Sequence, residues 1–126
     1  SLIDERQEIA AVYNGKPCLD VGLMTDVFSG YGKSDGIIRA VRCMSPDYIV
    51  TDELGADAKS IRQAVNSGSG LIMTAHADSI EEAYRNEGIR TVIDSGAIQH
   101  IALVQSHRIT AVKQLITAEA NAGCTI

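Results

Sequence analysis

The sequence predicts an α/β domain with a mostly parallel sheet, and two observations carry that prediction. Short runs of apolar and β-branched residues alternate along the chain with longer segments in which apolar residues recur at helical spacing. Such alternation favours a parallel sheet that is covered by helices. The chain has 126 residues, of which 45% are apolar, enough for the core of a single domain over residues 1–126.

The first half of the chain contains two predicted strands, a predicted helix and a long loop. Leu2-Ile3 ends a buried strand, residues 8–13 add a helical turn, and the glycine-containing residues 14–34 form mostly loop. Asp35–Met44 is predicted to be helical, because its apolar residues share one helix face and Ser-Pro follows it. Tyr48–Thr51 is a short apolar and β-branched run that is typical of a buried parallel strand.

The second half repeats the alternation and ends in a predicted hairpin. Ser79-Ile80-Glu81-Glu82 is a capping-box pattern, which marks the start of a helix. The predicted elements are a helix over Asp57–Ser67, a buried strand over Leu71–Thr74, a helix from Ser79 to Gly96 that is broken near Gly88, and hairpin strands Ile98–Val104 and Ile109–Ile116 joined by Ser106–Arg108, with fraying from about Asn121.

Composition argues against several classes of function. The net charge of −5 argues against a broad nucleic-acid-binding face, so we expect no nucleic-acid partner. Cys18, Cys43 and Cys124 lie far apart, so neither a disulfide framework nor a zinc site is indicated, and a reducing cytoplasm is the expected location. No apolar run approaches the roughly 20 residues that a membrane-spanning helix needs.

Charged and polar residues follow three of the predicted strands. They are Asp4-Glu5-Arg6, Asp52-Glu53 and Thr74-Ala75-His76. The carboxyl ends of parallel strands meet at one edge of a sheet, and ligands bind beyond that edge. These three groups are therefore the candidate functional site.

Gly32-Lys33-Ser34 has the last three letters of a phosphate-binding loop, Gly-x4-Gly-Lys-Ser/Thr. The first glycine of that motif would fall at position 27, which is Val27, and Leu23–Asp26 before it makes a poor buried strand. We therefore interpret the triplet as a loop and helix start, with Ser34 or Asp35 near the N-cap.

A buried strand that ends in Asp52-Glu53 has the form of a Walker B motif. In this interpretation Asp52 holds Mg²⁺ and Glu53 polarises the attacking water, whereas the alternative is an ordinary acidic exit from a strand. Thr74 and His76 end the next predicted strand, where they could hydrogen-bond the water or a γ-phosphate. A lone histidine at a strand end can equally be structural.

Other polar residues have two readings each. Asp4-Glu5-Arg6 could bind metal-bound water and phosphate, or form a surface ion-pair cluster. Arg42 could reach a phosphate, or cover its helix with the aliphatic part of its side chain. We interpret His100 and His107, which flank a hairpin strand, as structural.

Four segments of the chain together resemble the stage III sporulation protein AA family, ATPases of endospore-forming bacteria related to the traffic ATPases of type II and type IV secretion. The segments are IDERQEIAA, DVGLMTDV, GIIRAVRCMSPDYIVTDELG and GLIMTAHADSIEEA, over roughly residues 1–105. The resemblance implies a three-layer RecA-like P-loop NTPase core, ATP and Mg²⁺ as cofactors, and a homo-oligomeric, hexameric ring. It also implies a cytoplasmic protein, peripheral at the membrane, that powers or assembles a membrane-embedded sporulation channel.

The resemblance further implies a role for each matching residue. Asp4, Glu5 and Arg6 would form an acidic box, in which Asp4 lies near the metal, Glu5 is catalytic and Arg6 contacts phosphate. Asp52 and Glu53 would form the Walker B motif, with Asp52 as the Mg²⁺ ligand and Glu53 as the catalytic base. Arg42 would contact phosphate, and Thr74 and His76 would form a histidine box that senses the γ-phosphate.

The chain departs from the family at its start. The phosphate-binding loop of the family lies upstream of the acidic box, and the sequence begins at that box. We therefore expect residues 1–126 to be a partial ATPase domain, truncated at its N-terminus, with weak or no nucleotide affinity alone. A RecA-like sheet without its phosphate-loop strand would leave two unpaired inner edges.

Two other functions remain open from the sequence. The chain could be a non-catalytic module in which a degenerate ATPase fold serves oligomerisation. It could also be a metal-dependent hydrolase that uses His76, Asp78 and Asp52, although no second nearby histidine supports this.

Overall fold

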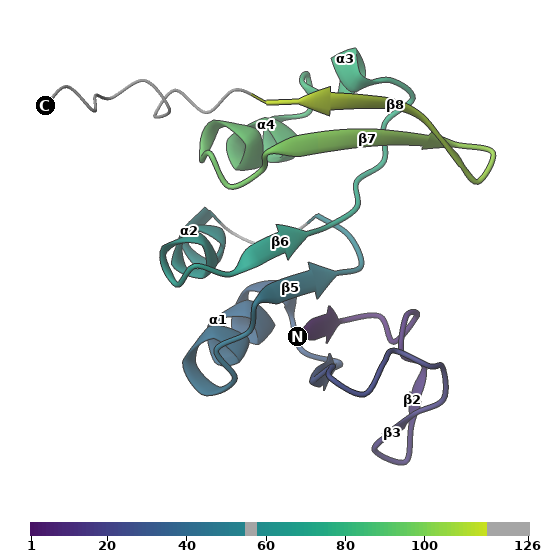
Figure 1. Cartoon of the computed structure of the whole chain (residues 1–126), viewed down its shortest axis with the longest axis vertical. Coiled ribbons are helices and arrows are strands. Elements are labelled where there is room, and N and C mark those ends of the chain that lie inside the picture. The colour runs from purple at the N-terminus through teal and green to yellow at the C-terminus, as the bar shows by residue number, and fades with distance from the viewer. Residues whose placement is uncertain (55–57, 116–126) are drawn as a thin grey trace, which may run out of the picture.

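The centre of the molecule is a four-stranded parallel sheet, seen in a computed structural model that describes residues 1–54 and 58–115 (Figure 1). The strands lie in the order β4-β1-β5-β6, and every pairing between them is parallel. Their bounds are β4 Val27–Ser29, β1 Leu2–Asp4, β5 Tyr48–Thr51 and β6 Gly70–Ile72. The α/β class and the mostly parallel sheet predicted from the sequence are confirmed.

Helices α1, Lys33–Cys43, and α2, Ala58–Asn66, pack against each other and against one face of this sheet. The buried core joins side chains of both helices to side chains of β1 and β5, namely Ile3, Ile37, Ala40, Ile49 and Ala64. Gly36 lets α1 approach the sheet closely, because a Cβ at this position would lie 2.5 Å from Cγ2 of Ile3. This close packing holds the first turn of α1 beside the end of β1.

The other end of the molecule consists of two short helices and a hairpin (Figure 1). These are α3, Ile80–Ala83, α4, Glu87–Asp94, β7, His100–Gln105, and β8, Arg108–Gln114. Ser106 and His107 have φ angles of 48° and 62°, as a two-residue type I′ turn requires. The predicted hairpin is therefore confirmed.

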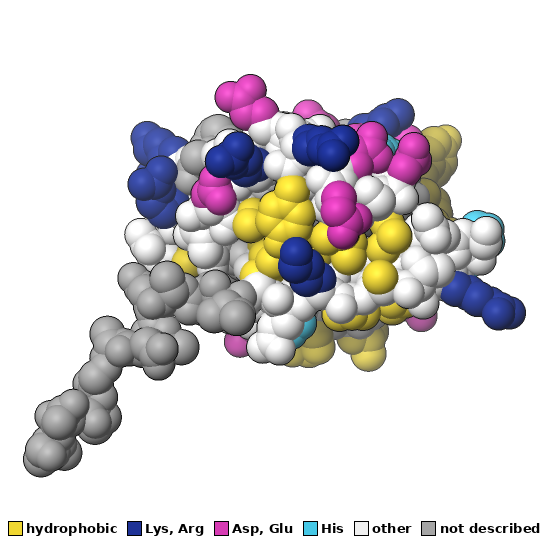
Figure 2. Space-filling model, turned by 90° about the horizontal axis from the view of Figure 1, so that it is seen from above, with side chains coloured by type: hydrophobic (Ala, Val, Ile, Leu, Met, Phe, Trp, Pro, Cys, Tyr) yellow, Lys and Arg dark blue, Asp and Glu magenta, His cyan; other side chains and the backbone are white. Residues whose placement is uncertain are grey.

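Exposed apolar side chains gather on the hairpin end (Figure 2). Val104, Ile109 and Val112 are 60%, 66% and 63% exposed, and charged side chains surround the apolar area. Lys113 Nζ lies 4.7 Å from the centroid of the Tyr84 ring, a cation–π contact that ties β8 to the end of α3. No helix within the described residues is long and apolar enough to cross a membrane.

The largest difference from the predicted elements lies in residues 8–34. We predicted a helical turn and then loop, but the structure contains a small hairpin, β2 Val12–Tyr13 with β3 Lys16–Pro17, and the strand β4. Segments of two or three residues are too short for a periodic signal, and β4 is a strand because it pairs with β1.

Other boundaries differ by a few residues. Helix α1 begins at Lys33, before the predicted Asp35, and β6 ends at Ile72, so Thr74 and His76 lie in the following loop. The break between α3 and α4 comes before Gly88, because the side chain of Asn86 accepts hydrogen bonds from the first turn of α4. The predicted helix start at Asp57, the strand end at Ile116 and the fraying from Asn121 lie outside the described residues.

Candidate functional site

The carboxyl ends of β1 and β5 bring two acidic side chains to a lysine at the start of α1. Lys33 Nζ lies 2.8 Å from Oε2 of Glu5 and 3.1 Å from Oδ1 of Asp52. The side chains of Lys33 and Asp52 are only 10% and 7% exposed, whereas that of Glu5 is 41% exposed. We call Glu5, Lys33 and Asp52 the lysine–carboxylate cluster.

The cluster stabilises the charged form of both of its buried members. Burial by itself lowers the pKa of the Lys33 ammonium, but hydrogen bonds to Glu5 and Asp52 outweigh it, so the pKa is raised. Burial by itself raises the pKa of the Asp52 carboxyl, but the hydrogen bonds from Lys33 and from the Glu53 backbone N–H outweigh it, so the pKa is lowered. Asp52 is thus a carboxylate at neutral pH.

Among the described residues, one carboxylate oxygen of Asp52 accepts no hydrogen bond of standard geometry, although the backbone N–H of Arg6 lies near enough to the carboxylate to help lower its pKa. Its Oδ1 accepts from Lys33 and, at 2.8 Å, from the backbone N–H of Glu53. Its Oδ2 is buried and, within the described residues, has no hydrogen-bond partner of standard geometry. A buried, unpartnered, charged oxygen is costly unless something binds it, and Mg²⁺ takes oxygen ligands from one or two carboxylates. Asp52 therefore fits the metal-binding role that the sequence predicts for it.

The loop after β6 is tied to the loop after β5. The Thr74 hydroxyl donates a hydrogen bond to the backbone carbonyl of Asp52, and the Leu54 N–H donates to the Thr74 carbonyl at 2.7 Å. His76, two residues further on, is exposed and lines a hollow of about 300 Å³ together with Glu53. The structure thus brings the predicted base and the predicted histidine to the same hollow.

Arg6 and Glu53 lie at the rim of the site. Arg6 Nη1 is 4.0 Å from Oε2 of Glu53, and Arg6 Nε is 3.4 Å from Oε1 of Glu8. The side chains of Arg6 and Glu53 are 61% and 41% exposed. Exposed ion pairs of this kind are weak, so both side chains are free to turn toward a ligand.

Asp4, in contrast, faces away from the lysine–carboxylate cluster. Its carboxylate is fully buried and accepts hydrogen bonds from the backbone N–H groups of Glu8, Ile9 and Ala10 at 2.8–3.3 Å. Both oxygens are engaged, so this arrangement gives Asp4 the part of an anchor for the loop after β1. Its predicted position near a metal stays a prediction that this arrangement does not favour.

Arg42 does not join the cluster within this chain. It lies in the last turn of α1, whereas Lys33 is the first residue of the same helix. At 1.5 Å per residue, the nine residue steps from Lys33 to Arg42 correspond to roughly 13 Å along the helix axis. Its predicted phosphate contact stays a prediction.

Lys33 is the site residue that the sequence analysis missed. The sequence does not predict a phosphate-binding loop at the Gly-Lys-Ser triplet, and it predicts no role for Lys33. One feature of the sequence could have indicated that Lys33 has acidic partners. It is a lysine at the start of a helix, where the helix dipole disfavours a positive charge, and acidic residues follow two of the strands. Only the fold places the three side chains together.

The described residues contain no group of three or more His, Cys, Asp and Glu side chains that could hold a metal ion. In particular, His76, Asp78 and Asp52 do not form such a group. A Mg²⁺ ion held by one carboxylate and by substrate phosphates does not require such a group.

Comparisons with known proteins agree with the resemblance seen in the sequence. The family model described as "Sporulation stage III, protein AA" matches residues 1–119. "Stage III sporulation protein AA" of Bacillus subtilis (strain 168) is 27% identical over 123 residues, which are 95% of this chain and 40% of that protein. No solved structure matches. The chain thus spans 40% of the length of the curated relative it matches.

Proposed function

The chain belongs to the "Sporulation stage III, protein AA" family, and from this premise we propose that it is part of a sporulation ATPase. In this proposal residues 1–126 supply the acidic half of a site for Mg²⁺-dependent ATP hydrolysis. The full-length protein supplies the phosphate-binding loop and uses the hydrolysis to power or assemble a secretion-like channel.

One observation carries the proposal: Oδ2 of the buried, charged Asp52 accepts no hydrogen bond of standard geometry from the described residues. A carboxylate in this state, at the carboxyl end of a parallel strand, is placed as a Walker B aspartate would be. When bound, Mg²⁺ neutralises charge on the transferred phosphate. Asp52 would hold it, with Asp4 kept to its anchoring role.

The neighbouring residues fit the remaining tasks of hydrolysis. Glu53 is partly exposed beside the hollow that His76 also lines, so its carboxylate can accept a proton from a water in that hollow. His76 and Arg6 can donate hydrogen bonds to phosphate oxygens. Thr74 positions the Asp52 backbone. Glu5 pairs with Lys33 through Oε2, so its other carboxylate oxygen can accept a hydrogen bond from metal-bound water.

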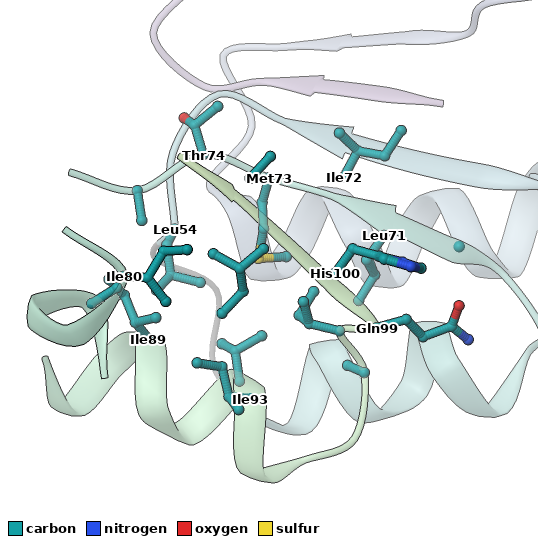
Figure 3. A pocket seen from close by; sticks show the side chains of 18 of the residues that line it. Leu54, Leu71, Ile72, Met73, Thr74, Ile80, Ile89, Ile93, Gln99 and His100 are labelled. Carbon is teal, nitrogen blue, oxygen red and sulfur yellow. The ribbon is translucent and has the colours of Figure 1, made fainter. Parts of the chain in front are cut away.

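A groove between β6 and β7 supports the RecA-like architecture (Figure 3). It has a volume of about 850 Å³, and apolar side chains of β6, of the loop after it, and of α3, α4 and β7 line it, among them Leu71, Met73, Ile80, Ile89, Ile93 and Ile101. Strands β6 and β7 run in the same direction (Figure 1), and each is paired on one side only within the described residues. Unpaired apolar edges need a cover.

We propose that a strand from the part of the full-length protein outside residues 1–126 fills this groove. A strand that is parallel to β6 and β7 would pair with both and join the hairpin to the central sheet. The resemblance implies that this strand lies upstream of residue 1, directly before the phosphate-binding loop.

The groove proposal predicts a difference in amide hydrogen exchange between the full-length protein and residues 1–126. Amides of Leu71–Met73 and Ile101–Leu103 that face the groove should exchange at least about tenfold more slowly in the full-length protein. There, local opening of such an amide must also break its backbone hydrogen bond to the inserted strand. Amides of β4, at the opposite edge of the sheet, are the control. Equal exchange at the groove in both proteins would rule out an inserted strand.

The ATPase proposal predicts that the full-length protein binds ATP in the presence of Mg²⁺ and releases phosphate, while residues 1–126 bind ATP weakly or not at all. Calorimetry with ATP, with and without EDTA, measures the binding, and phosphate release measures turnover. The Asp52→Asn variant, which removes the proposed Mg²⁺ ligand, should lose turnover. A full-length protein that binds no ATP would instead support the non-catalytic oligomerisation module.

A further inference from the structure

Lys33 stands in an electrostatically unusual place. It is the first residue of α1, where the helix dipole and the free backbone N–H groups disfavour a positive charge. Its side chain is nevertheless 10% exposed and lies against the carboxylates of Asp52 and Glu5. The two carboxylates together offset the cost of placing an ammonium group there.

The ammonium group engages the same carboxylate that the proposed function assigns to Mg²⁺. Lys33 Nζ is 3.1 Å from Oδ1 of Asp52, and Oδ2 of that carboxylate is buried and accepts no hydrogen bond of standard geometry from the described residues. A divalent cation bound to Oδ2 at the usual distance of about 2.1 Å would lie within a few ångströms of Nζ. Two positive charges at that distance in a site this buried repel each other strongly.

We propose that Lys33 is the resident counter-ion of Asp52 and that a divalent cation binds Asp52 only by displacing the Lys33 ammonium. This inference rests on the proposed function for the assignment of Asp52 to the metal, and adds the residue that sets how tightly the metal binds. Lys33 is thus a positioning residue, which holds the carboxylate in place until the metal arrives.

Glu5 gives the displaced lysine a place to go. Its carboxylate is 2.8 Å from Lys33 Nζ and 41% exposed, so it lies between the buried site and solvent. The flexible four-carbon stem of lysine can move its ammonium away from Asp52 while the pair with Glu5 is kept. The movement therefore exchanges a bridging lysine for one that is paired only with Glu5.

The first test measures Mn²⁺ binding to the full-length protein in the presence of ADP, which supplies phosphate oxygens, by electron paramagnetic resonance, with Mg²⁺ as competitor. Lys33→Met keeps the stem and removes the charge, and it should bind Mn²⁺ roughly tenfold or more tightly than the unmodified chain. Lys59→Met, at an exposed position of α2, removes the same charge elsewhere and should leave the affinity unchanged. Circular dichroism confirms that each variant is folded.

The outcomes separate this inference from the proposed function. Mn²⁺ binding that Asp52→Asn abolishes, but that Lys33→Met leaves equal or weakens, would keep the metal site and overturn the role of Lys33. Binding by neither the unmodified chain nor Lys33→Met would overturn the metal site, and with it this inference. Equal tightening by Lys33→Met and Lys59→Met would reduce the effect to overall charge and also overturn the role of Lys33.

A second measurement needs no variant. Reductive methylation of the unmodified chain should modify Lys33 slowly, because its ammonium is buried and paired, and Mg²⁺ should accelerate that modification several-fold. Lys59 is the internal reference, since its modification rate should not depend on Mg²⁺. A Lys33 rate that does not change at Mg²⁺ concentrations where the metal is bound would contradict displacement.

Discussion

Replacing Glu53 with glutamine in the full-length protein is expected to lower ATP turnover by roughly 10²- to 10⁴-fold, the usual contribution of a general base, while ATP affinity changes little. The amide keeps the shape of the side chain but cannot accept a proton from the attacking water. The fold should tolerate the change, because Glu53 is 41% exposed and the ion pair that it forms with Arg6 is long at 4.0 Å. Phosphate release and calorimetry with ATP measure the two quantities separately.

Glu8→Gln is the matched control for this variant. Glu8 also pairs with Arg6, at 3.4 Å, and is 59% exposed, but it does not line the hollow that Glu53 and His76 share. Its replacement should leave turnover within about twofold of the unmodified protein, since exposed ion pairs contribute little. Undiminished turnover in Glu53→Gln would show that another group activates the water. An equal loss in both variants would place the effect in Arg6.

The parts of the fold that could be predicted are those with long, periodic sequence signals. Helix α1 has a run of apolar residues on one face, and β5 is a β-branched run, and both were located to within two residues. Strand β4 was missed because Val27–Ser29 is only partly buried and has no pattern of its own. Its pairing with β1 makes it a strand, and pairing between distant segments has no local signature.

In the candidate site, the positions of residues along the chain could be predicted, but the directions of their side chains could not. Asp52-Glu53 lies directly after β5 and Thr74 lies two residues beyond β6, close to the edge that the sequence predicts, because topology alone brings the ends of parallel strands to one edge. The direction of each side chain could not be predicted. Asp4 and Glu5 are adjacent in sequence, yet Asp4 turns inward to backbone amides and Glu5 turns to Lys33. The alternation of side chains along a strand separates them, and the loop after β1 decides which one is anchored.

Replacing Asp4 is expected to cause the largest loss of stability of any single substitution in the site. The carboxylate is fully buried and satisfies the backbone N–H groups of Glu8, Ile9 and Ala10, so Asp4→Ala would leave three donors without a partner. Hydrogen bonds to a charged group contribute about 1.5–3 kcal/mol each, and breaking a buried charged network costs about 3–5 kcal/mol. That is a large part of the 5–15 kcal/mol by which small domains are typically stable.

Asp4→Asn tests the same contacts in a variant that is more certain to fold. One acceptor oxygen remains, but the amide NH₂ would face a backbone N–H, so the urea midpoint should fall between those of the unmodified chain and Asp4→Ala. Asp47→Asn, at an exposed position before β5, should leave the midpoint unchanged.

The decisive comparison is between the loss of stability that Asp4→Asn causes in EDTA and the loss that it causes in Mg²⁺. A loop anchor makes the loss equal in both, because the backbone amides need the carboxylate whether or not metal is present. A metal ligand would instead leave Asp4→Asn as stable as the unmodified chain in EDTA and weaken only its binding of Mn²⁺, and that result would restore the metal role that the sequence predicted for Asp4.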